Sequence, residues 1–365
     1  MQENEVDLRE LLSQDKVIPF YYDRSAFDPA GLPPLAVELH WTSDCNYDCV
    51  HCSYGSRRET KGKLTNEQIE YLVDDLIDLK AEAVYISGGG EPTVVKNWDK
   101  HASRLIDAGV QVSLITNGVA LREKHLHALS RMNYVAVSIY SDNPDQYAKT
   151  TDSRFYDVQW SAPKLIKSGG EQVVVGARCV INKINYKNIV EIYKRAMSSG
   201  YDYLIFIPAV DYEGRGVDLS RKEQEEVIEI INSNIDLFDN SKTNISSVLS
   251  RGAWHYEQKN YREDDKTPLG CNAIHLRFNA FVNYCGGIWL CQPHIGNTHF
   301  SIGNLFDQKF SNIWNSSKHQ SVMNALHRDY KAGFCKNCRS IGFNKAIAKS
   351  DLFVNPSSLK RDPFV

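Results

Sequence analysis

Three cysteines stand close together near the start of the chain, and their type and spacing indicate metal chemistry. They lie in the run Cys45-Asn46-Tyr47-Asp48-Cys49-Val50-His51-Cys52. Three thiolates on one tight loop can bind three irons of a [4Fe–4S] cluster and leave the fourth iron open to a small-molecule ligand. Zinc is the rival metal, but structural zinc takes four protein ligands, and ligation by both His51 and Cys52 would be strained.

The elements that must hold this loop are predicted from a repeating pattern. Short apolar runs alternate with amphipathic helical patterns, as expected of buried parallel strands joined by helices. The strands are expected at residues 35–41, 83–87, 111–116, 134–140, 173–181 and 203–208. Helices are expected after a capping box at residues 65–68 and at 98–108, 121–130, 160–167 and 186–198. The pattern predicts an α/β fold, a partial parallel (β/α)6 barrel, whose functional loops gather at the C-terminal ends of the strands.

The cysteine spacing, on the loop after the first expected strand, resembles the signature of the radical S-adenosylmethionine (SAM) superfamily. The resemblance implies that Cys45, Cys49 and Cys52 hold a [4Fe–4S] cluster whose open iron is chelated by the amino and carboxylate groups of SAM. It places His51 where the family usually has an aromatic residue near the adenine. It also implies that SAM is cleaved reductively to a 5′-deoxyadenosyl radical. A chance cysteine trio and a zinc site are the alternatives.

The loop after the second expected strand supports the resemblance. Its run is Ser87-Gly88-Gly89-Gly90-Glu91-Pro92-Thr93. This run resembles the glycine–glutamate–proline motif of the superfamily, which implies that Gly89, Gly90 and Glu91 meet the amino group of SAM. Glycines let the backbone approach a ligand closely, and a plain glycine-rich turn is the alternative reading.

Three further residues follow the same resemblance along the next strands. Asn117, after the third strand, stands in the family's usual turn, and a left-handed turn residue is the alternative. Ser138 on the fourth strand and Arg178 on the fifth lie where the family often contacts the ribose and the carboxylate of SAM. A structural salt bridge explains Arg178 equally well.

A second group of cysteines lies near the C-terminal end. Its members are Cys271, Cys291, Cys335 and Cys338. Short strands are expected at residues 281–284 and 288–290, on either side of a Gly286-Gly287 turn. This pattern resembles Twitch, the auxiliary-cluster domain that is a shortened relative of the SPASM domain, and it implies one auxiliary [4Fe–4S] cluster on the four thiolates. A four-cysteine zinc site is the alternative.

Two cysteines remain outside both groups. Cys179, in the fifth strand, is expected to be a small buried hydrophobe. Cys285 lies at the hairpin turn between two predicted cluster ligands. A thiol there can donate a hydrogen atom to a substrate radical, as in some epimerases of the broad family, so Cys285 is a candidate catalytic residue. The alternative is that Cys285 is an ordinary turn residue or an alternate cluster ligand.

Composition narrows the classes of partner. The net charge is −3, with basic and acidic residues interspersed, which gives no electrostatic footprint for nucleic acid or an anionic membrane. No apolar run reaches the roughly 20 residues of a membrane helix, and the acidic N-terminus does not read as a signal peptide. We therefore expect a cytoplasmic protein that binds neither a membrane nor nucleic acid. The resemblance to radical SAM enzymes implies that it receives electrons from an external one-electron reductant such as flavodoxin or ferredoxin.

The chain is expected to divide into five segments. These are an N-terminal extension at 1–34, the barrel at 35–216, a connecting helix and linker at 217–266, a small C-terminal iron–sulfur domain with a β-hairpin at 267–349, and a tail at 350–365. The long helix of the connecting segment is expected at residues 219–238. Residues 1–34 are expected to be too few for an independent leader-binding domain, which favours a small-molecule substrate over a peptide.

The resemblance implies hydrogen abstraction from a carbon of a peptide or natural-product substrate, giving oxidation, crosslinking or epimerisation. A sugar, aminocyclitol or nucleoside dehydrogenase or epimerase is the alternative enzyme. A zinc or electron-transfer scaffold is the non-enzyme alternative. The motifs bear on radical initiation and on the second cluster, so the expected substrate class rests on family analogy.

Overall fold

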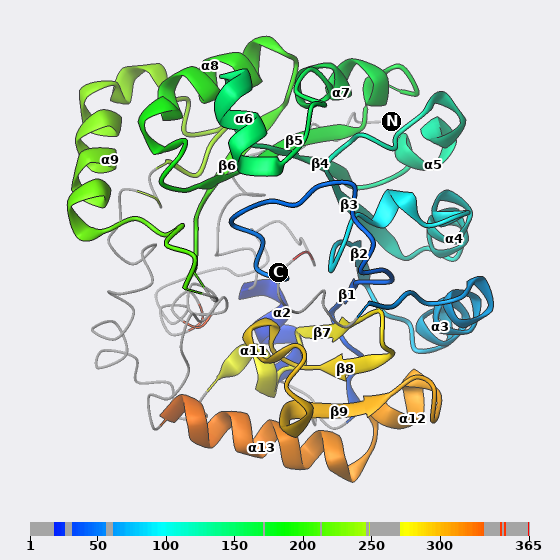
Figure 1. Cartoon of the computed structure of the whole chain (residues 1–365). Helices are drawn as coiled ribbons and strands as arrows, with labels where there is room; N and C mark the ends of the chain where they lie inside the picture. The colour runs from blue at the N-terminus through cyan, green and yellow to red at the C-terminus, as the bar shows by residue number, and fades with distance from the viewer. Residues whose placement is uncertain are drawn as a thin grey trace.

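One sheet organises the computed structural model, which describes residues 18–25, 31–55, 61–170, 172–211, 214–245, 248, 271–331, 344, 347 and 364. Within these residues the sheet has nine strands in the order β6-β5-β4-β3-β2-β1-β7-β8-β9. The first six strands are parallel neighbours and do not close into a full barrel (Figure 1). The predicted partial barrel is therefore confirmed.

The barrel strands lie where the apolar runs predicted them, with ends that differ by no more than a few residues. They are β1 (Ala36–Leu39), β2 (Ala83–Ile86), β3 (Gln111–Thr116), β4 (Tyr134–Ile139), β5 (Val174–Ile181) and β6 (Tyr203–Pro208). The helices that cover their outer face are α3 (Asn66–Asp78), α4 (Trp98–Asp107), α5 (Leu126–Leu129), α7 (Val158–Lys167) and α8 (Ile189–Ser198). The capping box predicted for the first of them is present, with Thr65 as N-cap and Gln68 as its partner. Helix α6 (Pro144–Thr151) lies instead at the C-terminal ends of the strands, beside the cysteine loop (Figure 1).

Helix α6 was not predicted, although the sequence carries a start signal for it. Asn143 is the N-cap and accepts hydrogen bonds from the backbone of Asp145 and Gln146, and Pro144 occupies the first helical position. Proline at that position loses nothing, because the first amide groups of a helix have no intrahelical acceptor. The helix is only two turns long, which is too short for a clear apolar period.

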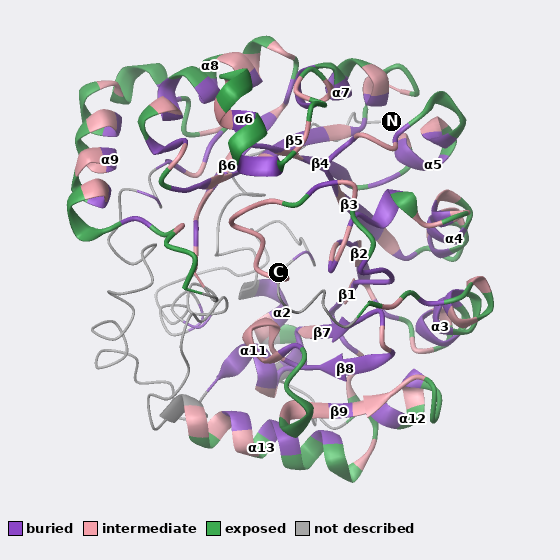
Figure 2. Cartoon of the chain, in the orientation of Figure 1, coloured by how far each residue is buried: buried purple, intermediate pink, exposed green. Residues whose placement is uncertain are grey.

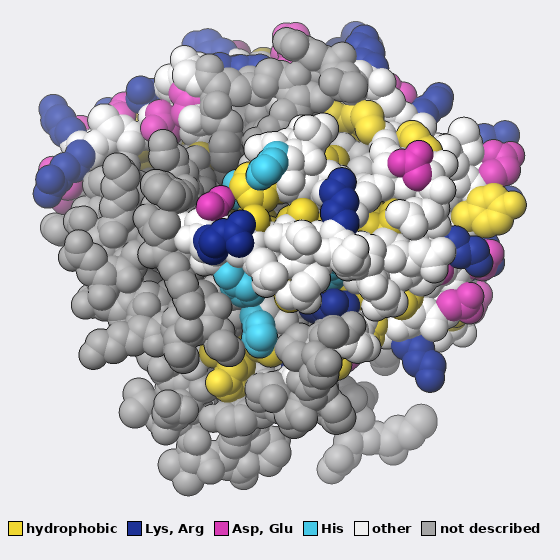
Figure 3. Space-filling model, turned by 90° about the horizontal axis from the view of Figure 1, so that it is seen from below, with side chains coloured by type: hydrophobic (Ala, Val, Ile, Leu, Met, Phe, Trp, Pro, Cys, Tyr) yellow, Lys and Arg dark blue, Asp and Glu magenta, His cyan; other side chains and the backbone are white. Residues whose placement is uncertain are grey.

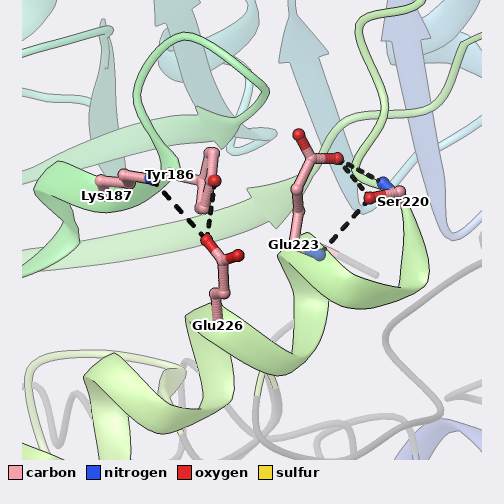
Figure 4. A network of polar contacts seen from close by, with 5 residues as sticks. All are labelled: Tyr186, Lys187, Ser220, Glu223 and Glu226. Carbon is pink, nitrogen blue, oxygen red and sulfur yellow. Dashed lines mark hydrogen bonds and ion pairs between the residues drawn. The ribbon is translucent and has the colours of Figure 1, made fainter.

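The helix expected at 219–238 is shorter in the structure. It is α9 (Arg221–Ser233), followed by the 3-10 turn η7 (Ile235–Leu237). Ser220 and Glu223 form a capping box at its start, and Tyr186 donates a hydrogen bond of 2.9 Å to Glu226 (Figure 4). This network fastens α9 to the segment before α8.

Part of the expected linker at 241–266 extends the sheet edge. The backbone amide of Leu204 in β6 donates to the carbonyl of Lys242 at 2.8 Å, and Leu204 and Thr243 form a parallel bridge. The structure describes residues 241–245 and 248 of this segment, and the rest lies outside the described residues.

The two faces of the barrel sheet are occupied by alternate residues of each strand. The face toward the helices carries Val37, Leu39, Val84 and Ile86 and their equivalents on the later strands, and these side chains form the main apolar core. Figure 2 shows this burial along the strands and on the inner sides of the helices. The inner face carries smaller or polar side chains near its N-terminal end.

Phe364 fills the space that these smaller side chains leave. It packs with Ala36, Ala83 and Ala136, and its ring lies 4.9 Å from Tyr85 and 5.2 Å from Tyr134. Ala36 and Ala83 are the first residues of their strands, so Phe364 closes the barrel at the end opposite the functional loops. The expected polar tail at 350–365 thus contains a buried aromatic residue, 3% exposed.

The C-terminal region continues the same sheet. Its elements are α11 (Asn272–His275), β7 (Asn279–Val282), β8 (Gly287–Trp289), β9 (Ser301–Asn304), α12 (Phe310–Trp314) and α13 (Ser317–Lys331). Strands β7 and β8 are antiparallel, which confirms the predicted hairpin, and β7 pairs in parallel with β1. The strand before the first cysteine loop is therefore hydrogen-bonded to the auxiliary region.

The N-terminal extension also contacts the auxiliary region. Helix α2 (Ile18–Ser25) carries Arg24, whose guanidinium donates to the carbonyl oxygens of Leu276 at 3.1 Å and Pro33 at 2.9 Å. Trp314 donates its indole N–H to the carbonyl of Leu32 at 2.9 Å. These contacts bind the extension to α11 and α12.

No helix within the described residues has the length and apolar character needed to cross a membrane. On the face shown in Figure 3, lysine and arginine side chains are interspersed with aspartate and glutamate.

Candidate active site

The first cysteine loop leaves β1 at the C-terminal end of the barrel strands. Cys45 is exposed, and Cys49 and Cys52 are half-buried. A turn brings the last two together, since the amide of Cys52 donates to the carbonyl of Cys49 at 3.0 Å. Partial exposure of all three thiols is what a cluster with a small-molecule ligand requires.

Helix α6 holds the middle of this loop. The backbone amides of Asp48 and Val50 donate to the carbonyls of Thr151 and Thr150 at 3.0 and 2.9 Å. Both threonines are fully buried, so water does not compete for these two hydrogen bonds. The position of the cysteines thus depends on a helix that follows the fourth strand.

The glycine-rich loop after β2 holds the start of the cysteine loop. The amide of Gly90 donates to the carbonyl of Thr42, and that of Glu91 to the carbonyl of Asp44, each at 2.8 Å. A Cβ atom on Gly90 would lie 2.0 Å from the carbonyl oxygen of Asp44. Glycine is required here because the two backbones touch.

The Glu91 carboxylate joins the ends of β2 and β3. One oxygen accepts from the Thr93 amide at 3.1 Å and the Thr116 hydroxyl at 2.6 Å, and the other accepts from the Asn117 amide at 2.7 Å. Burial raises its pKa, although these hydrogen bonds act in the opposite direction. The sequence motif is therefore also a structural brace beneath the cysteine loop.

Asn117 connects this brace to the cysteines. Its side-chain amide donates to the Asn46 side chain at 2.6 Å, and Asn46 stands between Cys45 and Cys49. The left-handed residue of this turn is Gly118, with φ +82°, so Asn117 is not needed there as a left-handed turn residue.

Tyrosines pack behind Cys49, and sequence reasoning did not identify them as a group. Tyr47, Tyr140 and Tyr147 form a buried cluster that Cys49 touches, and the hydroxyls of Tyr47 and Tyr147 are hydrogen-bonded to each other. Burial first, and then the neighbouring Cys49, raises the pKa of Tyr140. They come from the cysteine loop, the position directly after β4, and α6, so no local signal could have indicated that they lie together.

His51 lies beside this cluster. Its ring centroid is 5.7 Å from that of Tyr140, and its Nδ1 is 3.5 Å from the Asn182 side-chain nitrogen. Burial lowers the pKa of His51 to about 4, so the imidazole is neutral near pH 7.

Ser138 and Arg178 are register partners on the inner face of β4 and β5. Arg178 acts electrostatically on Glu38 in β1, a residue that the sequence analysis did not select. Burial acts to raise the pKa of Glu38, but the hydrogen bond and charge of His40, 2.7 Å away, and the charge of Arg178 hold it below its usual range. Strand tilt in a barrel explains why residues on β1 and β5 face one another.

The second cysteine group is partly described. Cys271 is 5% exposed and Cys291 is half-buried, whereas Cys335 and Cys338 lie outside the described residues. Among the described residues no three His, Cys, Asp or Glu side chains converge on one point as metal ligands would. The donor chemistry nevertheless fits iron–sulfur ligation, because both groups consist of cysteines, whose thiolates are the usual ligands of these clusters.

The hairpin turn of the auxiliary region faces the first cysteine loop. A Cβ on Gly89 would meet the Tyr284 ring at 2.5 Å, and a Cβ on Gly62 would lie 3.5 Å from the Cys285 sulfur. Gly62 is in turn hydrogen-bonded to Ser43, two residues before Cys45. Cys285 therefore lies on the side of the auxiliary region that contacts the first loop.

A second contact joins the two cysteine regions. Gln292, next to Cys291, donates to the hydroxyl of Tyr54 at 3.3 Å, and Tyr54 follows Cys52 by two residues. Tyr54 also packs on Phe281 and Trp289 of the hairpin.

Comparison with known proteins agrees with this arrangement. Residues 39–206 match the family described as Radical SAM superfamily, and residues 271–339 match SPASM, an iron-sulfur cluster-binding domain. The mycofactocin maturase MftC of Mycobacterium tuberculosis is 24% identical over 319 residues, which cover 84% of this chain and 75% of the relative. The Fe-coproporphyrin III synthase of Methanosarcina barkeri is 28% identical over 207 residues, covering 53% of this chain and 50% of the relative.

Solved structures share the fold. Streptococcus suis SuiB bound to S-adenosylmethionine superposes with a TM-score of 0.62 at 15% identity, covering 90% of this chain and 76% of that one. His-tagged anSMEcpe with bound AdoMet superposes with a TM-score of 0.58 at 18% identity, covering 86% of this chain and 85% of that one. Residues 39–206 therefore form a radical SAM domain and residues 271–339 a SPASM-type domain, in an enzyme that uses SAM and two iron–sulfur clusters.

Proposed function

We propose that this radical SAM enzyme abstracts a hydrogen atom from a carbon of a peptide substrate, giving an oxidised, crosslinked or epimerised product. The observation that carries the initiation step is the backbone contact of Gly90 and Glu91 with Thr42 and Asp44. It fixes the cysteine loop directly against the glycine-rich loop, so that a ligand bound to one lies within reach of the other. Pre-positioning of this kind is how a protein directs a reactive cofactor.

In this proposal Cys45, Cys49 and Cys52 hold the first cluster, and Gly89, Gly90 and Glu91 bound the methionine end of SAM. When bound, the cluster and SAM supply the 5′-deoxyadenosyl radical. The neutral ring of His51 lies near the adenine.

The remaining cofactor contacts come from the barrel strands. Asn117 orients the loop through Asn46, and Ser138 and Arg178 contact the ribose and carboxylate from β4 and β5. Arg178 is suited to a carboxylate because its guanidinium can make two parallel hydrogen bonds. An external one-electron reductant such as flavodoxin or ferredoxin supplies the electron.

The auxiliary region decides the fate of the substrate radical. In this proposal Cys271, Cys291, Cys335 and Cys338 hold the second cluster, which supplies an acceptor for the electron that an oxidation or crosslink releases. Cys285 supplies the alternative, because a thiol hydrogen atom delivered to the opposite face of the radical carbon gives an epimer. Its position beside Gly62 places it toward the first loop.

The peptide assignment is supported by the relatives. MftC is named as a maturase and matches over 84% of this chain. SuiB, which shares the fold at a TM-score of 0.61, has been solved bound to its precursor peptide SuiA. These similarities favour a peptide over the small molecule that the short N-terminal extension suggested.

The initiation step is tested by anaerobic reconstitution. The wild-type chain should bind roughly eight irons, and a Cys45→Ala/Cys49→Ala/Cys52→Ala variant roughly four. The variant should release no 5′-deoxyadenosine from SAM with dithionite. Cys179→Ala is the matched control, because Cys179 is buried in β5 at 1% exposure and should leave iron and SAM cleavage unchanged. Equal iron content in the triple variant and the wild type would contradict the proposal that these three cysteines hold the cluster that initiates the reaction.

The substrate assignment is tested with precursor peptides encoded beside the gene. An oxidised or crosslinked product has the mass of the substrate less two hydrogen atoms. An epimer formed in H2O has the same mass as the substrate, and an epimer formed in D2O carries one additional deuterium. Deuterium uptake that disappears in Cys285→Ala, with SAM cleavage retained, would establish the epimerase branch. Product formation that is unaffected in Cys285→Ala would exclude Cys285 as the hydrogen donor.

A further inference from the structure

One buried amide in the auxiliary region contacts both a helix start and a cysteine. Asn344 is fully buried, and its Oδ1 accepts hydrogen bonds from the backbone amides of Asn272 at 2.9 Å and Ala273 at 3.3 Å. Its Nδ2 donates to the sulfur of Cys271 at 3.5 Å. These contacts lie 71 to 73 residues apart in sequence.

The orientation of this amide is fixed by its partners. Two backbone N–H groups can bond only to the oxygen of the Asn344 side chain, so the nitrogen must face Cys271. The oxygen does the work of an N-cap for α11, whose own N-cap position is held by Cys271, a residue type that caps helices poorly. Rotating the amide would leave the two backbone groups without an acceptor in a buried place, which is costly.

An N–H donor to a cluster thiolate has a predictable electronic effect. It withdraws charge from the sulfur and so stabilises the more negative, reduced state of the cluster, which raises the reduction potential. Because both partners are buried, water does not screen the interaction between the N–H group and the sulfur. A higher potential makes the cluster a better acceptor for an electron from a substrate radical.

We propose that Asn344 is a positioning residue of the auxiliary cluster, which orients Cys271 and raises the reduction potential of the cluster it ligates. The proposal rests on the assignment of Cys271 as a ligand, made above as part of the proposed function. It adds a residue beyond the cysteine pattern, six positions after Cys338.

The test measures the midpoint potential of the auxiliary cluster by electron paramagnetic resonance during redox titration. The Cys45→Ala/Cys49→Ala/Cys52→Ala chain is the parent, since it should hold the auxiliary cluster alone. Asn344→Ala removes every contact of the amide without adding charge. Asn344→Asp keeps an oxygen for the two backbone groups and removes the donor to sulfur. We expect both variants to lower the midpoint potential.

The pair of variants separates three explanations. A role in capping alone predicts a normal potential in Asn344→Ala wherever the cluster is retained. The carboxylate introduced by Asn344→Asp lowers the potential through its charge in any case, so a lower potential there supports the proposal only together with a lower potential in Asn344→Ala. A normal potential in either variant would overturn the proposal. Asn283→Asp is the matched control, because Asn283 accepts from the amides of Cys285 and Gly287 through its Oδ1, each at 3.0 Å. It should shift the potential less than either Asn344 variant.

Failure of the ligand assignment is detected separately. Cys271→Ala in the same parent should abolish the auxiliary iron, and full iron there would overturn both the ligand role and the proposal. If Asn344→Ala loses its cluster, the potential of Asn344→Asp becomes the test, because that variant keeps an oxygen for the backbone amides of Asn272 and Ala273. A normal potential in that variant counts against the amide–sulfur bond.

Discussion

The two cysteine regions are held in place by different means. The first loop carries partly exposed thiols and is fixed largely by backbone groups of the glycine-rich loop and of helix α6, with Gly90 pressed against Asp44. In the auxiliary region Cys271 is buried and is fixed by a side chain, Asn344. The difference agrees with the proposed roles of the two regions, since a cluster that binds SAM needs an open side and a fully ligated cluster does not.

The difference also predicts how each region fails. Backbone contacts leave no room for a new atom, so the first region should be sensitive to added volume. Side-chain contacts can be removed one at a time, so the second region should be tuned by deletion. The following predictions test that contrast, and they run from the largest expected effect to the smallest.

Gly90→Ala should have the largest effect. The new methyl group would lie 2.0 Å from the carbonyl oxygen of Asp44, so the two loops must separate. A displacement of about 1 Å at a reacting centre can cost roughly 100-fold in rate, and we expect at least that loss in SAM cleavage. The measurement is 5′-deoxyadenosine release with dithionite. Gly31→Ala, which has nothing within 4 Å, is the control, and near-normal cleavage by Gly90→Ala would contradict the contact.

Phe364→Ala should lower stability more than any other substitution proposed for the barrel. The ring fills a space lined by alanines, and its removal should cost about 3–5 kcal/mol of unfolding free energy. Urea unfolding followed by circular dichroism measures the loss. Phe306→Ala is the matched control, because Phe306 in the auxiliary region is 53% exposed and should change stability by less than about 0.5 kcal/mol. Similar values for the two would rule out the packing of Phe364.

Gly89→Ala tests the contact between the two regions. Its methyl group would meet the Tyr284 ring at 2.5 Å, and that ring is 5% exposed and cannot easily move away. Overpacking of this kind costs about 1–3 kcal/mol. Thermal unfolding of the two single variants and of Gly89→Ala/Tyr284→Ala gives the coupling. If the clash is real, the double variant should be less destabilised than the sum of the singles.

Tyr147→Phe should have the smallest effect. It removes the hydroxyl that is hydrogen-bonded to Tyr47, at a cost of about 1 kcal/mol. Tyr71→Phe, at a residue 74% exposed, should be neutral in the same unfolding assay. An effect of Tyr147→Phe no larger than that control would mean that the tyrosine pair does not hold the cysteine loop.

The barrel could be predicted closely because each strand and helix has its own local period. Strands β3 and β6 begin and end where the apolar runs do, and α3 begins at its capping box. The cysteine loop and the glycine-rich loop were placed correctly after β1 and β2, since motif position follows once the strands are known.

Contacts between distant segments could not be predicted. Tyr147 and Thr151 of α6 reach the cysteine loop across about 100 residues, and nothing in the local sequence marks them as its anchor. Phe364 lies in a tail that was expected to be polar, and Asn344 lies beyond the last cysteine of the auxiliary pattern. Their role depends on what surrounds them in space.

The sequence by itself identified the candidate donors, because three cysteines on one loop and the four cysteines of the second group form a recognisable pattern regardless of how the chain packs. It also determined the α/β order of the barrel through local periodicity. Tertiary structure alone decided which groups fix those donors: Gly90 against Asp44, the α6 carbonyls against the cysteine loop, and Asn344 against Cys271. The reason is physical, since backbone approach, burial and hydrogen-bond geometry between residues far apart in sequence exist only after the strands have paired.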